Sequence, residues 1–203
     1  MTSQFDFIRR TKHDMISKRE ECDPLSVLKL ENHTIDDIYA LPDGQRAELI
    51  DGVIYDMAPP SIQHQELSWE LSAQIRNYIK KKDGECKAYA APFAVFLNAD
   101  NKTYVEPDIS VICDKSKIDN RGCIGAPDWI IEIVSPSSKY MDYITKLLKY
   151  KAAGVREYWI VDPLKETIGV YNFETETAEH YNFTDKVKTG IYEDLEIDFS
   201  EIE

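Results

Sequence analysis

Two acidic residues lie inside apolar segments that are short enough to be β-strands. Asp108 belongs to Tyr104-Val-Glu-Pro-Asp-Ile-Ser-Val-Ile-Cys113, and Glu132 belongs to Trp129-Ile-Ile-Glu-Ile-Val134. A carboxylate in an apolar strand is costly to bury unless it binds a cation or becomes neutral. Two such strands close together in the sequence therefore predict a hard-metal site that activates water. The alternative for Glu132 is a structural ion pair with a buried lysine or arginine.

The segment after the Glu132 strand predicts a helix with further reactive groups. Ser135-Pro-Ser-Ser138 is a helix cap, and the helix covers Lys139–Ala153. Asp142, Lys146 and Tyr150 are spaced at i, i+4 and i+8, so they share one helix face. A solvent-facing Asp–Lys pair worth a few tenths of a kcal/mol is the more ordinary interpretation of these two charges. Because the cap is short, the lysine could instead fold back over the carboxylates.

Two more candidate residues lie upstream. Glu48, in Ala47-Glu-Leu-Ile-Asp-Gly52, is either an exposed strand residue or a further ligand. His64 lies in the first turn of a predicted helix, where a histidine is more often a core or capping residue than a ligand. The pattern His64-x-x-x-Ser68 also lacks the second ligand of a zinc helix.

The donor types indicate which cation and which reaction this set would serve. Carboxylates without paired histidines or cysteines favour Mg²⁺ or Mn²⁺ over Zn²⁺. Such ions lower the pKa of a bound water and stabilise the charge of a transferring phosphoryl group. A nearby lysine could orient or deprotonate that water, or neutralise the transition state. These parts suit the hydrolysis of phosphodiesters.

The elements that must position these residues follow from turn signals and periodicity. Asp51-Gly52 suits a type I′ turn, so Arg46–Ile50 and Val53–Met57 predict a hairpin. Apolar residues at every fourth position predict a helix over Ile62–Lys82 with a buried stripe of Leu67, Leu71, Ile75 and Ile79. Predicted strands then cover Lys87–Leu97, Val105–Cys113, Trp129–Val134 and Val155–Val161, with a second hairpin at Ile168–Phe173 and Glu179–Phe183.

Domain organisation is simple. Residues 1–33 are polar with balanced charge and no period, which indicates an N-terminal extension. Residues 34–203 predict one domain, because no repeat or linker interrupts them. Within it, Glu132 should share a strand face with Ile130 and Val134, in a central strand covered on both sides. The acidic end after Gly190 is expected to be ordered only in part.

Composition excludes several classes of protein. The 203 residues are 43% hydrophobic and 30% charged, which is typical of a globular domain. No stretch approaches the roughly 20 apolar residues of a membrane helix, and the first residues lack a secretory h-region. The four cysteines show no Cys-x-x-Cys spacing, so reduced thiols in a cytoplasmic protein are expected.

The formal net charge of −13 argues at first against a nucleic-acid partner. Its distribution weakens that objection, because residues 157–203 hold 13 Asp/Glu against 3 Lys. Residues 1–156 hold 24 Asp/Glu against 21 Lys/Arg, so the candidate site lies in the nearly neutral part. Charge alone does not decide whether the chain binds nucleic acid.

The order of motifs resembles a known family. Ala47-Glu-Leu-Ile-Asp-Gly52, Met57-Ala-Pro-Pro-Ser61 with His64, and Pro107-Asp108 come first. Ala126-Pro-Asp-Trp-Ile-Ile-Glu-Ile-Val-Ser-Pro136 and Gly154-Val-Arg-Glu-Tyr-Trp-Ile-Val-Asp-Pro163 follow. From about Thr34 to Ile202 the series resembles the Uma-two family of restriction endonucleases, a branch of the PD-(D/E)xK nuclease superfamily.

The resemblance implies an α/β (α+β) fold with a central mixed sheet flanked by helices, like that of restriction endonucleases. It also implies a nuclease in which Mg²⁺ or Mn²⁺ assists hydrolysis of nucleic acid, DNA being the expected substrate. Asp108 and Glu132 match the two metal-binding acids, and Glu48 matches an additional upstream acid. Val134 stands where the superfamily usually has its lysine, so the resemblance assigns that role to Lys146. Homodimers are common among such nucleases.

Two other functions stay open from the sequence. One is a catalytically silent nucleic-acid- or protein-binding module that has kept the fold. The other is a metal-dependent hydrolase acting on something smaller than nucleic acid. The complete set of Glu48, Asp108, Glu132 and Lys146 favours the nuclease, whereas the acidic C-terminal part favours the alternatives.

Overall fold

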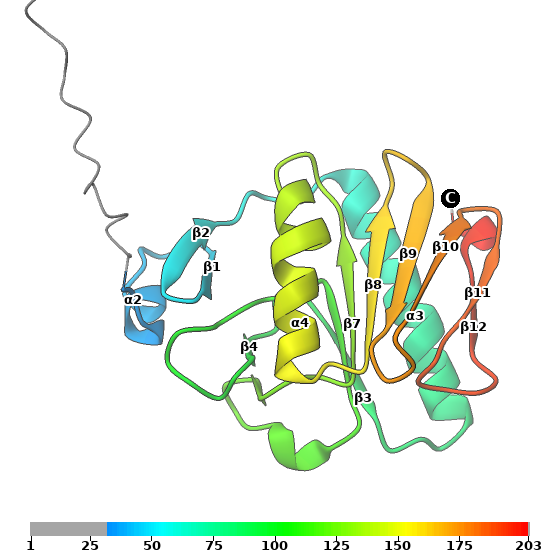
Figure 1. Ribbon diagram of the computed structural model, residues 1–203, viewed down its shortest axis with the longest axis horizontal. Helices are drawn as coiled ribbons and strands as arrows, with labels where there is room; N and C mark the ends of the chain where they lie inside the picture. The colour runs from blue at the N-terminus through cyan, green and yellow to red at the C-terminus, as the bar shows by residue number, and fades with distance from the viewer. Residues whose placement is uncertain (1–31, 203) are drawn as a thin grey trace, which may run out of the picture. The chain divides into compact units, whose positions relative to one another are not determined.

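A six-stranded mixed sheet forms the frame of the computed structural model, which describes residues 32–202 (Figure 1). The strand order is β10-β9-β8-β7-β5-β3, and β7 and β8 are parallel while the other neighbours are antiparallel. This architecture confirms the predicted mixed sheet. Its strands, in chain order, are β3 (Lys87–Ala90), β5 (Ile109–Ile112), β7 (Trp129–Ile133), β8 (Glu157–Asp162), β9 (Thr167–Asn172) and β10 (Thr177–Asn182).

Nearly all of the predicted extension over residues 1–33 lies outside the described residues. Its boundary with a domain over residues 34–203 therefore stays a prediction. No helix in the described part of the chain combines the length and apolar character needed to cross a membrane.

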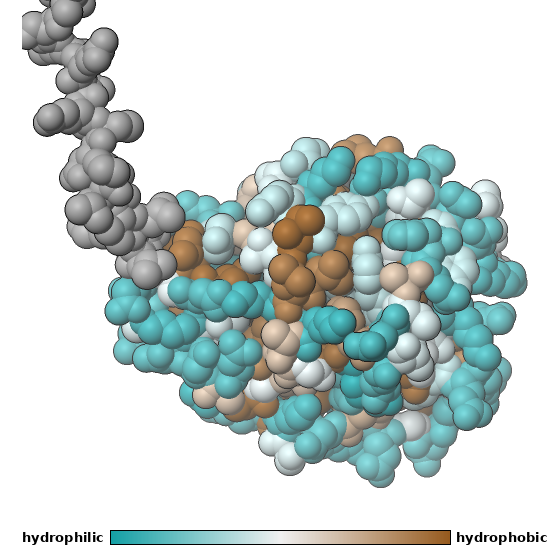
Figure 2. Space-filling model, viewed as in Figure 1, coloured by the Kyte–Doolittle hydropathy of each residue, from teal (hydrophilic) through white to brown (hydrophobic). Residues whose placement is uncertain are grey.

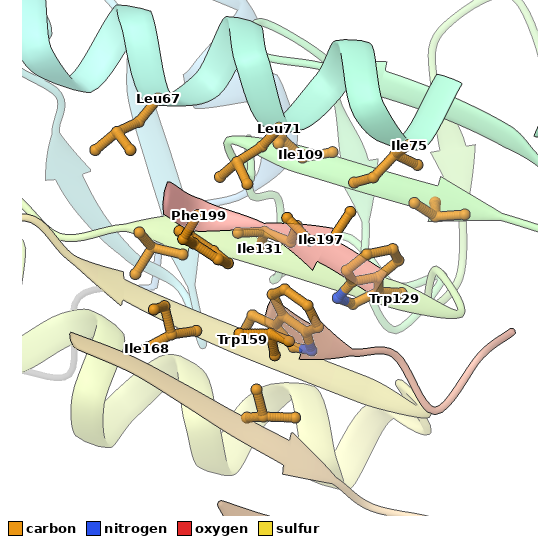
Figure 3. Packing of buried hydrophobic residues seen from close by; sticks show 14 of the residues in the cluster. Leu67, Leu71, Ile75, Ile109, Trp129, Ile131, Trp159, Ile168, Ile197 and Phe199 are labelled. Atoms are coloured by element: carbon orange, nitrogen blue, oxygen red, sulfur yellow. The ribbon is translucent and has the colours of Figure 1, made fainter. Parts of the chain in front are cut away.

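Helix α3 (Ile62–Lys81) covers one face of the sheet. Its four predicted apolar residues are all buried, and Figure 3 shows Leu67, Leu71 and Ile75 pointing toward Trp129 and Ile131 of β7. The predicted helix and its stripe are therefore confirmed. Burial of this stripe is the main force that holds α3 on the sheet.

The opposite face is covered by a helix that follows β7 and leads back to β8. It begins as a π-helix, η2 (Met141–Lys146), and continues as α4 (Leu147–Ala153), whose C-cap Gly154 has a φ of 90°. Side chains alternate along β7, so Ile130 and Glu132 face this helix while Trp129 and Ile131 face α3. The crossover thus brings its own polar residues to the Glu132 face.

The predicted N-terminal hairpin is present beside the sheet. Strands β1 (Ala47–Ile50) and β2 (Val53–Asp56) pair through Asp51 and Gly52, whose φ angles are 52° and 80°. Positive φ at both central positions is what a type I′ turn requires. The short helix α2 (Ile35–Tyr39) precedes the hairpin, and its capping box has Thr34 at the N-cap and Asp37 at N3.

Two predicted strands are shorter in the structure than the sequence suggested. The segment 87–97 divides at the cis Ala91–Pro92 bond into β3 and β4 (Val95–Phe96), and β4 pairs with β6 (Cys123–Ile124) outside the main sheet. Strand β5 begins only after Pro107-Asp108. Proline lacks the N–H that a sheet ladder needs, so both prolines lie outside the six-stranded sheet.

The expectation that the C-terminal end is only partly ordered is wrong for the described residues. Strands β11 (Lys186–Lys188) and β12 (Glu196–Asp198) form a small sheet, followed by the 3₁₀ turn η3 (Phe199–Glu201). Ile197 and Phe199 are fully buried against the α3 face of the main sheet (Figure 3). The apolar residues between the acids therefore outweigh the local negative charge.

The expectation of reduced thiols is wrong for two of the four cysteines. Cys86 precedes β3 and Cys113 follows β5, and the pairing of Lys87 with Ile112 places the two cysteines opposite one another. They form a disulfide with a Cα–Cα distance of 3.9 Å. Cys123 is a buried free thiol. A separation of 27 residues carries no local signal, so only strand pairing could reveal the bond.

Candidate functional site

Antiparallel pairing places Asp108 beside Glu132. Ile109 of β5 is opposite Ile131 of β7, and the residues that continue this register are Asp108 and Glu132. The backbone N–H of Ile133 donates to Asp108 Oδ2 at 2.8 Å. The two acids thus meet at one end of the sheet, where the N-terminal end of β5 adjoins the C-terminal end of β7.

Lys146 lies at the centre of three carboxylates. Its Nζ is 2.9 Å from Glu132 Oε1, 2.9 Å from Glu48 Oε2 and 3.8 Å from Asp142 Oδ1. Lys146 is only 5% exposed, so the interpretation of a solvent-facing Asp–Lys pair is wrong. The ion pair predicted as the alternative for Glu132 is present, and it is part of a larger cluster.

The helix that carries Lys146 departs in part from the pattern of an ordinary surface helix. It buries Asp142 and Lys146, whereas Ile144 and Leu148 are 47% and 63% exposed. Figure 2 shows apolar side chains at the surface over this part of the molecule. The turn that holds the two buried charges is π-helical. Such local departures from patterning are typical of functional positions.

Neutral groups fix the orientation of the buried carboxylates. The Tyr150 hydroxyl donates a hydrogen bond to Glu132 Oε1 at 2.6 Å, so this predicted residue lies inside the cluster. The Ser138 hydroxyl donates to Asp142 Oδ2 at 2.5 Å, so the cap serine also holds an acid of the site. The backbone N–H of Glu106 donates to Glu48 Oε1 at 3.0 Å. The carboxylate groups of Glu132, Asp142 and Glu48 are therefore each held in one orientation.

His64 reaches the site from the first turn of α3. Ser61 caps that helix by accepting from the backbone N–H of His64. His64 Nε2 is 3.2 Å from Asp108 Oδ2, while its Nδ1 is buried without a hydrogen-bond partner among the described residues. Burial lowers the pKa of His64, but Asp108, Asp142 and the Ile133 backbone together outweigh burial and raise that pKa overall.

Burial and mutual repulsion shape the protonation of the cluster. Burial raises the pKa of Glu132 well above its usual range, against the opposing attraction of Lys146. Burial also raises the pKa of Asp142 to about 6. For Lys146, burial lowers the pKa, but Glu132 and Glu48 outweigh it and raise the pKa well above its ordinary value. The neighbouring carboxylates therefore favour the ammonium form of Lys146, which donates hydrogen bonds to Glu48 and Glu132.

A pocket of about 710 Å³ opens above this cluster. Its walls come from the β1–β2 hairpin, the start of α3, the Ser135–Ser138 loop and the turn after β8. The lining residues that were not predicted from the sequence include Arg46, Tyr55 and Glu106. Alternation along the predicted hairpin could have indicated that Arg46 and Glu48 share one face.

The fit of a divalent cation can be judged from the donors alone. Four carboxylates (Glu48, Asp108, Glu132 and Asp142) share one lysine and one histidine, so negative charge is in excess. Oxygen donors of this kind suit Mg²⁺ or Mn²⁺. Within residues 32–202, no three His, Cys, Asp or Glu side chains already surround a common point, because Lys146 lies between the acids. The residues fit a cation held by two carboxylates and water.

Comparison with known proteins identifies the family. The model of the Uma2 family, described as "Putative restriction endonuclease", matches residues 35–199. The uncharacterized protein slr1290 of Synechocystis sp. is 26% identical over 129 residues, which are 63% of this chain and 66% of that protein, less than two thirds of its length. The crystal structure of "a putative nuclease belonging to DUF820" from Anabaena variabilis has a TM-score of 0.68. It is 24% identical and covers 83% of this chain and 96% of its own, a likeness that shows the fold. Because the family model spans most of the sequence, the chain belongs to the Uma2 family.

Proposed function

We propose that the protein is a Mg²⁺- or Mn²⁺-dependent endonuclease that hydrolyses phosphodiester bonds of nucleic acid, with DNA as the expected substrate. The observation that carries the proposal is the excess of carboxylates around Lys146 at the bottom of an open pocket. Buried acids without enough counter-charge are costly unless a cation joins them or they take up protons. The family description supports the same reaction class.

Asp108 and Glu132 would hold the cation, because they adjoin across β5 and β7 at the pocket. A bound divalent cation supplies a water of lowered pKa and neutralises charge on the phosphoryl group. The Ile133 N–H and the Tyr150 hydroxyl hold the two acids in place for this role. Glu48 completes the acidic wall and shares the ammonium of Lys146.

In the proposed hydrolysis a water oxygen bonds to phosphorus, and the bond from phosphorus to one sugar oxygen breaks. Lys146 would donate to a phosphoryl oxygen, where its positive charge offsets the charge that develops there. Asp142 and His64 border this position and are the proposed groups for exchanging protons with the water and the leaving oxygen.

A catalytically silent module is the second candidate, because Lys146 already pairs with Glu132 and Glu48. Glu132 and Glu48 alone would neutralise Lys146 in a purely structural ion pair, so Asp108 and Asp142 would not be needed for it. A structural ion pair would also give no reason for His64 and Asp108 to line the pocket. The two candidates differ in two measurable properties, which are cleavage of nucleic acid and the dependence of that cleavage on a bound divalent cation.

The test compares the whole protein with its Asp108→Asn variant. Labelled DNA and RNA are incubated with Mg²⁺ or Mn²⁺, and the melting temperature is recorded with and without the cation. The cation should raise the melting temperature of the unmodified protein, because it binds only the folded state. Cleavage and this shift should both be lost in Asp108→Asn. Equal cleavage by the two proteins, or no cation binding by either, refutes the proposal.

Two further properties stay predictions that accompany the proposal. Homodimerisation is expected only from the resemblance to such nucleases, and sedimentation of the purified chain tests it. Cytoplasmic location is tested by fractionation of the source cells.

A further inference from the structure

One face of the β1–β2 hairpin is directed toward the pocket. Glu48 and Tyr55 are directly opposite in the hairpin register. The hydrogen bond from Met57 N–H to the Arg46 carbonyl, at 2.9 Å, continues that register by one pair. Residues paired across antiparallel strands project to the same side. Arg46, Glu48, Tyr55 and Met57 therefore share one face, and all four line the pocket.

The opposite face of the hairpin belongs to the protein core. Ala47 and Leu49 are buried there with Phe96 and Tyr104, and Ile54 packs against the same cluster. The hairpin is therefore held by its apolar face, and its pocket face has a fixed orientation. This rigidity matters because a loosely held hairpin would lose conformational entropy when it binds a ligand, and that loss would weaken binding.

The pocket face changes in character from the bottom of the pocket to its opening. Glu48 is buried beside Lys146, whereas the Arg46 side chain is 37% exposed and Tyr55 is 36% exposed. Arg46 Nε donates to Glu106 Oε2 at 3.0 Å, and the Tyr104 hydroxyl donates to Glu106 Oε1 at 2.6 Å. Arg46 Nη2 contacts the same carboxylate oxygen, so the guanidinium is held near the opening.

An exposed aromatic ring beside a fixed guanidinium is a combination suited to single-stranded nucleic acid. The flat face of an unpaired base stacks on an aromatic side chain, and an arginine binds a backbone phosphate. Bases in a duplex are stacked on one another and cannot take that position without being unpaired. The lining of the pocket also includes apolar surface from Met141, Pro163 and the exposed Leu164.

The small number of cations and the size of the pocket limit how many phosphates it can contact. Among the described lining residues, the basic side chains other than His64 are Arg46 and Lys146. They face six carboxylates: Glu48, Asp56, Glu106, Asp108, Glu132 and Asp142. Duplex binding depends on many Lys and Arg contacts to the phosphates of both strands. The acids at the bottom are also buried, and a pocket of about 710 Å³ is comparable to a small-ligand site rather than to the width of a duplex.

We propose that the substrate of this site is single-stranded nucleic acid, with one base stacked on Tyr55 and an adjoining phosphate bound by Arg46. This proposal rests on the nuclease function proposed above and names the substrate class of the same site. The hairpin acts as a guide that leads an unpaired strand from the opening to Asp108, Glu132 and Lys146.

The first experiment compares substrates. One labelled oligonucleotide is incubated with the whole protein and Mn²⁺ as single-stranded DNA, as single-stranded RNA, and as DNA annealed to its complement. Faster cleavage of either single strand than of the duplex supports the proposal. Cleavage of the duplex at an equal or higher rate overturns it while leaving the nuclease function intact. No cleavage of any substrate overturns both.

The second experiment measures binding in the Asp108→Asn background, so that cleavage does not interfere. Tyr55→Ala should weaken single-strand binding about fivefold to about a hundredfold, the range for loss of one stacked base. Tyr55→Phe keeps the ring and should restore most of the affinity. Tyr39→Ala removes another exposed tyrosine, which lies outside the pocket, and should leave binding unchanged.

Salt dependence tests Arg46 separately. Arg46→Gln should reduce the slope of log affinity against log salt by about 0.7, the value for one phosphate contact on a single strand. Unchanged affinity in Tyr55→Ala together with an unchanged slope in Arg46→Gln overturns the proposed guide. Circular dichroism verifies that each variant is folded.

Discussion

Replacement of Lys146 by methionine is the most informative perturbation of the cluster. The substitution keeps an unbranched side chain that is one atom shorter, and it removes the ammonium that pairs with Glu48, Glu132 and Asp142. Removing one partner of a buried ion pair costs about 3–5 kcal/mol, because the remaining charge stays buried without compensation. For a domain of this size each kcal/mol lowers the melting temperature by about 2–4 °C. A loss of roughly 6–20 °C is therefore expected at neutral pH.

The pH dependence of this loss has a defined sign. Burial raises the pKa of Glu132, and it raises that of Asp142 to about 6. Without the attraction of Lys146 both pKa values rise further. An acid whose pKa is higher in the folded state destabilises the fold increasingly as pH rises above its unfolded pKa. The deficit of Lys146→Met should therefore be larger at pH 8 than at pH 5, and added Mg²⁺ should reduce it.

Lys149→Met is the matched control on the same helix. Lys149 pairs with Asp51, but their side chains are 32% and 57% exposed. An exposed pair of this kind contributes less than about 1 kcal/mol. Thermal unfolding of both variants, followed by circular dichroism at the two pH values, gives the comparison. Equal losses in Lys146→Met and Lys149→Met, or a loss that does not change with pH, would refute the assignment of Lys146 as the counter-ion of the buried acids.

Three further outcomes follow from the packing. Leu71→Ala should lower the free energy of unfolding by about 2–5 kcal/mol, because Leu71 is fully buried. Ile62 is exposed, so Ile62→Ala should change that free energy by less than about 0.5 kcal/mol. Urea unfolding measures both variants. Reduction of the Cys86–Cys113 disulfide should lower the free energy of unfolding by about 3–4 kcal/mol, a value that follows from the length of the closed loop. A reductant should not change the stability of a variant in which both cysteines are replaced by alanine. Burial raises the pKa of Cys123 to about 11, so its alkylation at pH 8 should require unfolding. Because that folded-state pKa lies above the unfolded value, stability linked to this thiol should be lost as pH rises from about 9 toward 11.

Local patterns in the sequence predicted the elements whose causes are local. Asp51-Gly52 has the residue types that a type I′ turn requires, and the four-residue period of α3 allows only one face to be buried. The apolar runs around Asp108 and Glu132 predicted strands, and their buried acids indicated a site. The shared motifs also predicted Lys146, although its spacing alone favoured a solvent-facing pair.

Contacts between distant segments decided the rest. The depth of Lys146 depends on how the π-helical turn packs against β7, where Asp142 and Lys146 are buried while Ile144 and Leu148 of the same helix stay exposed. The contribution of Arg46 and Tyr55 depends on how the hairpin is placed over the pocket, and Cys86 meets Cys113 only after β3 pairs with β5. The sequence by itself determined the acids, the hairpin and the amphipathic helix. The tertiary structure decided which charges meet, because burial and strand register are properties of the assembled chain rather than of any segment.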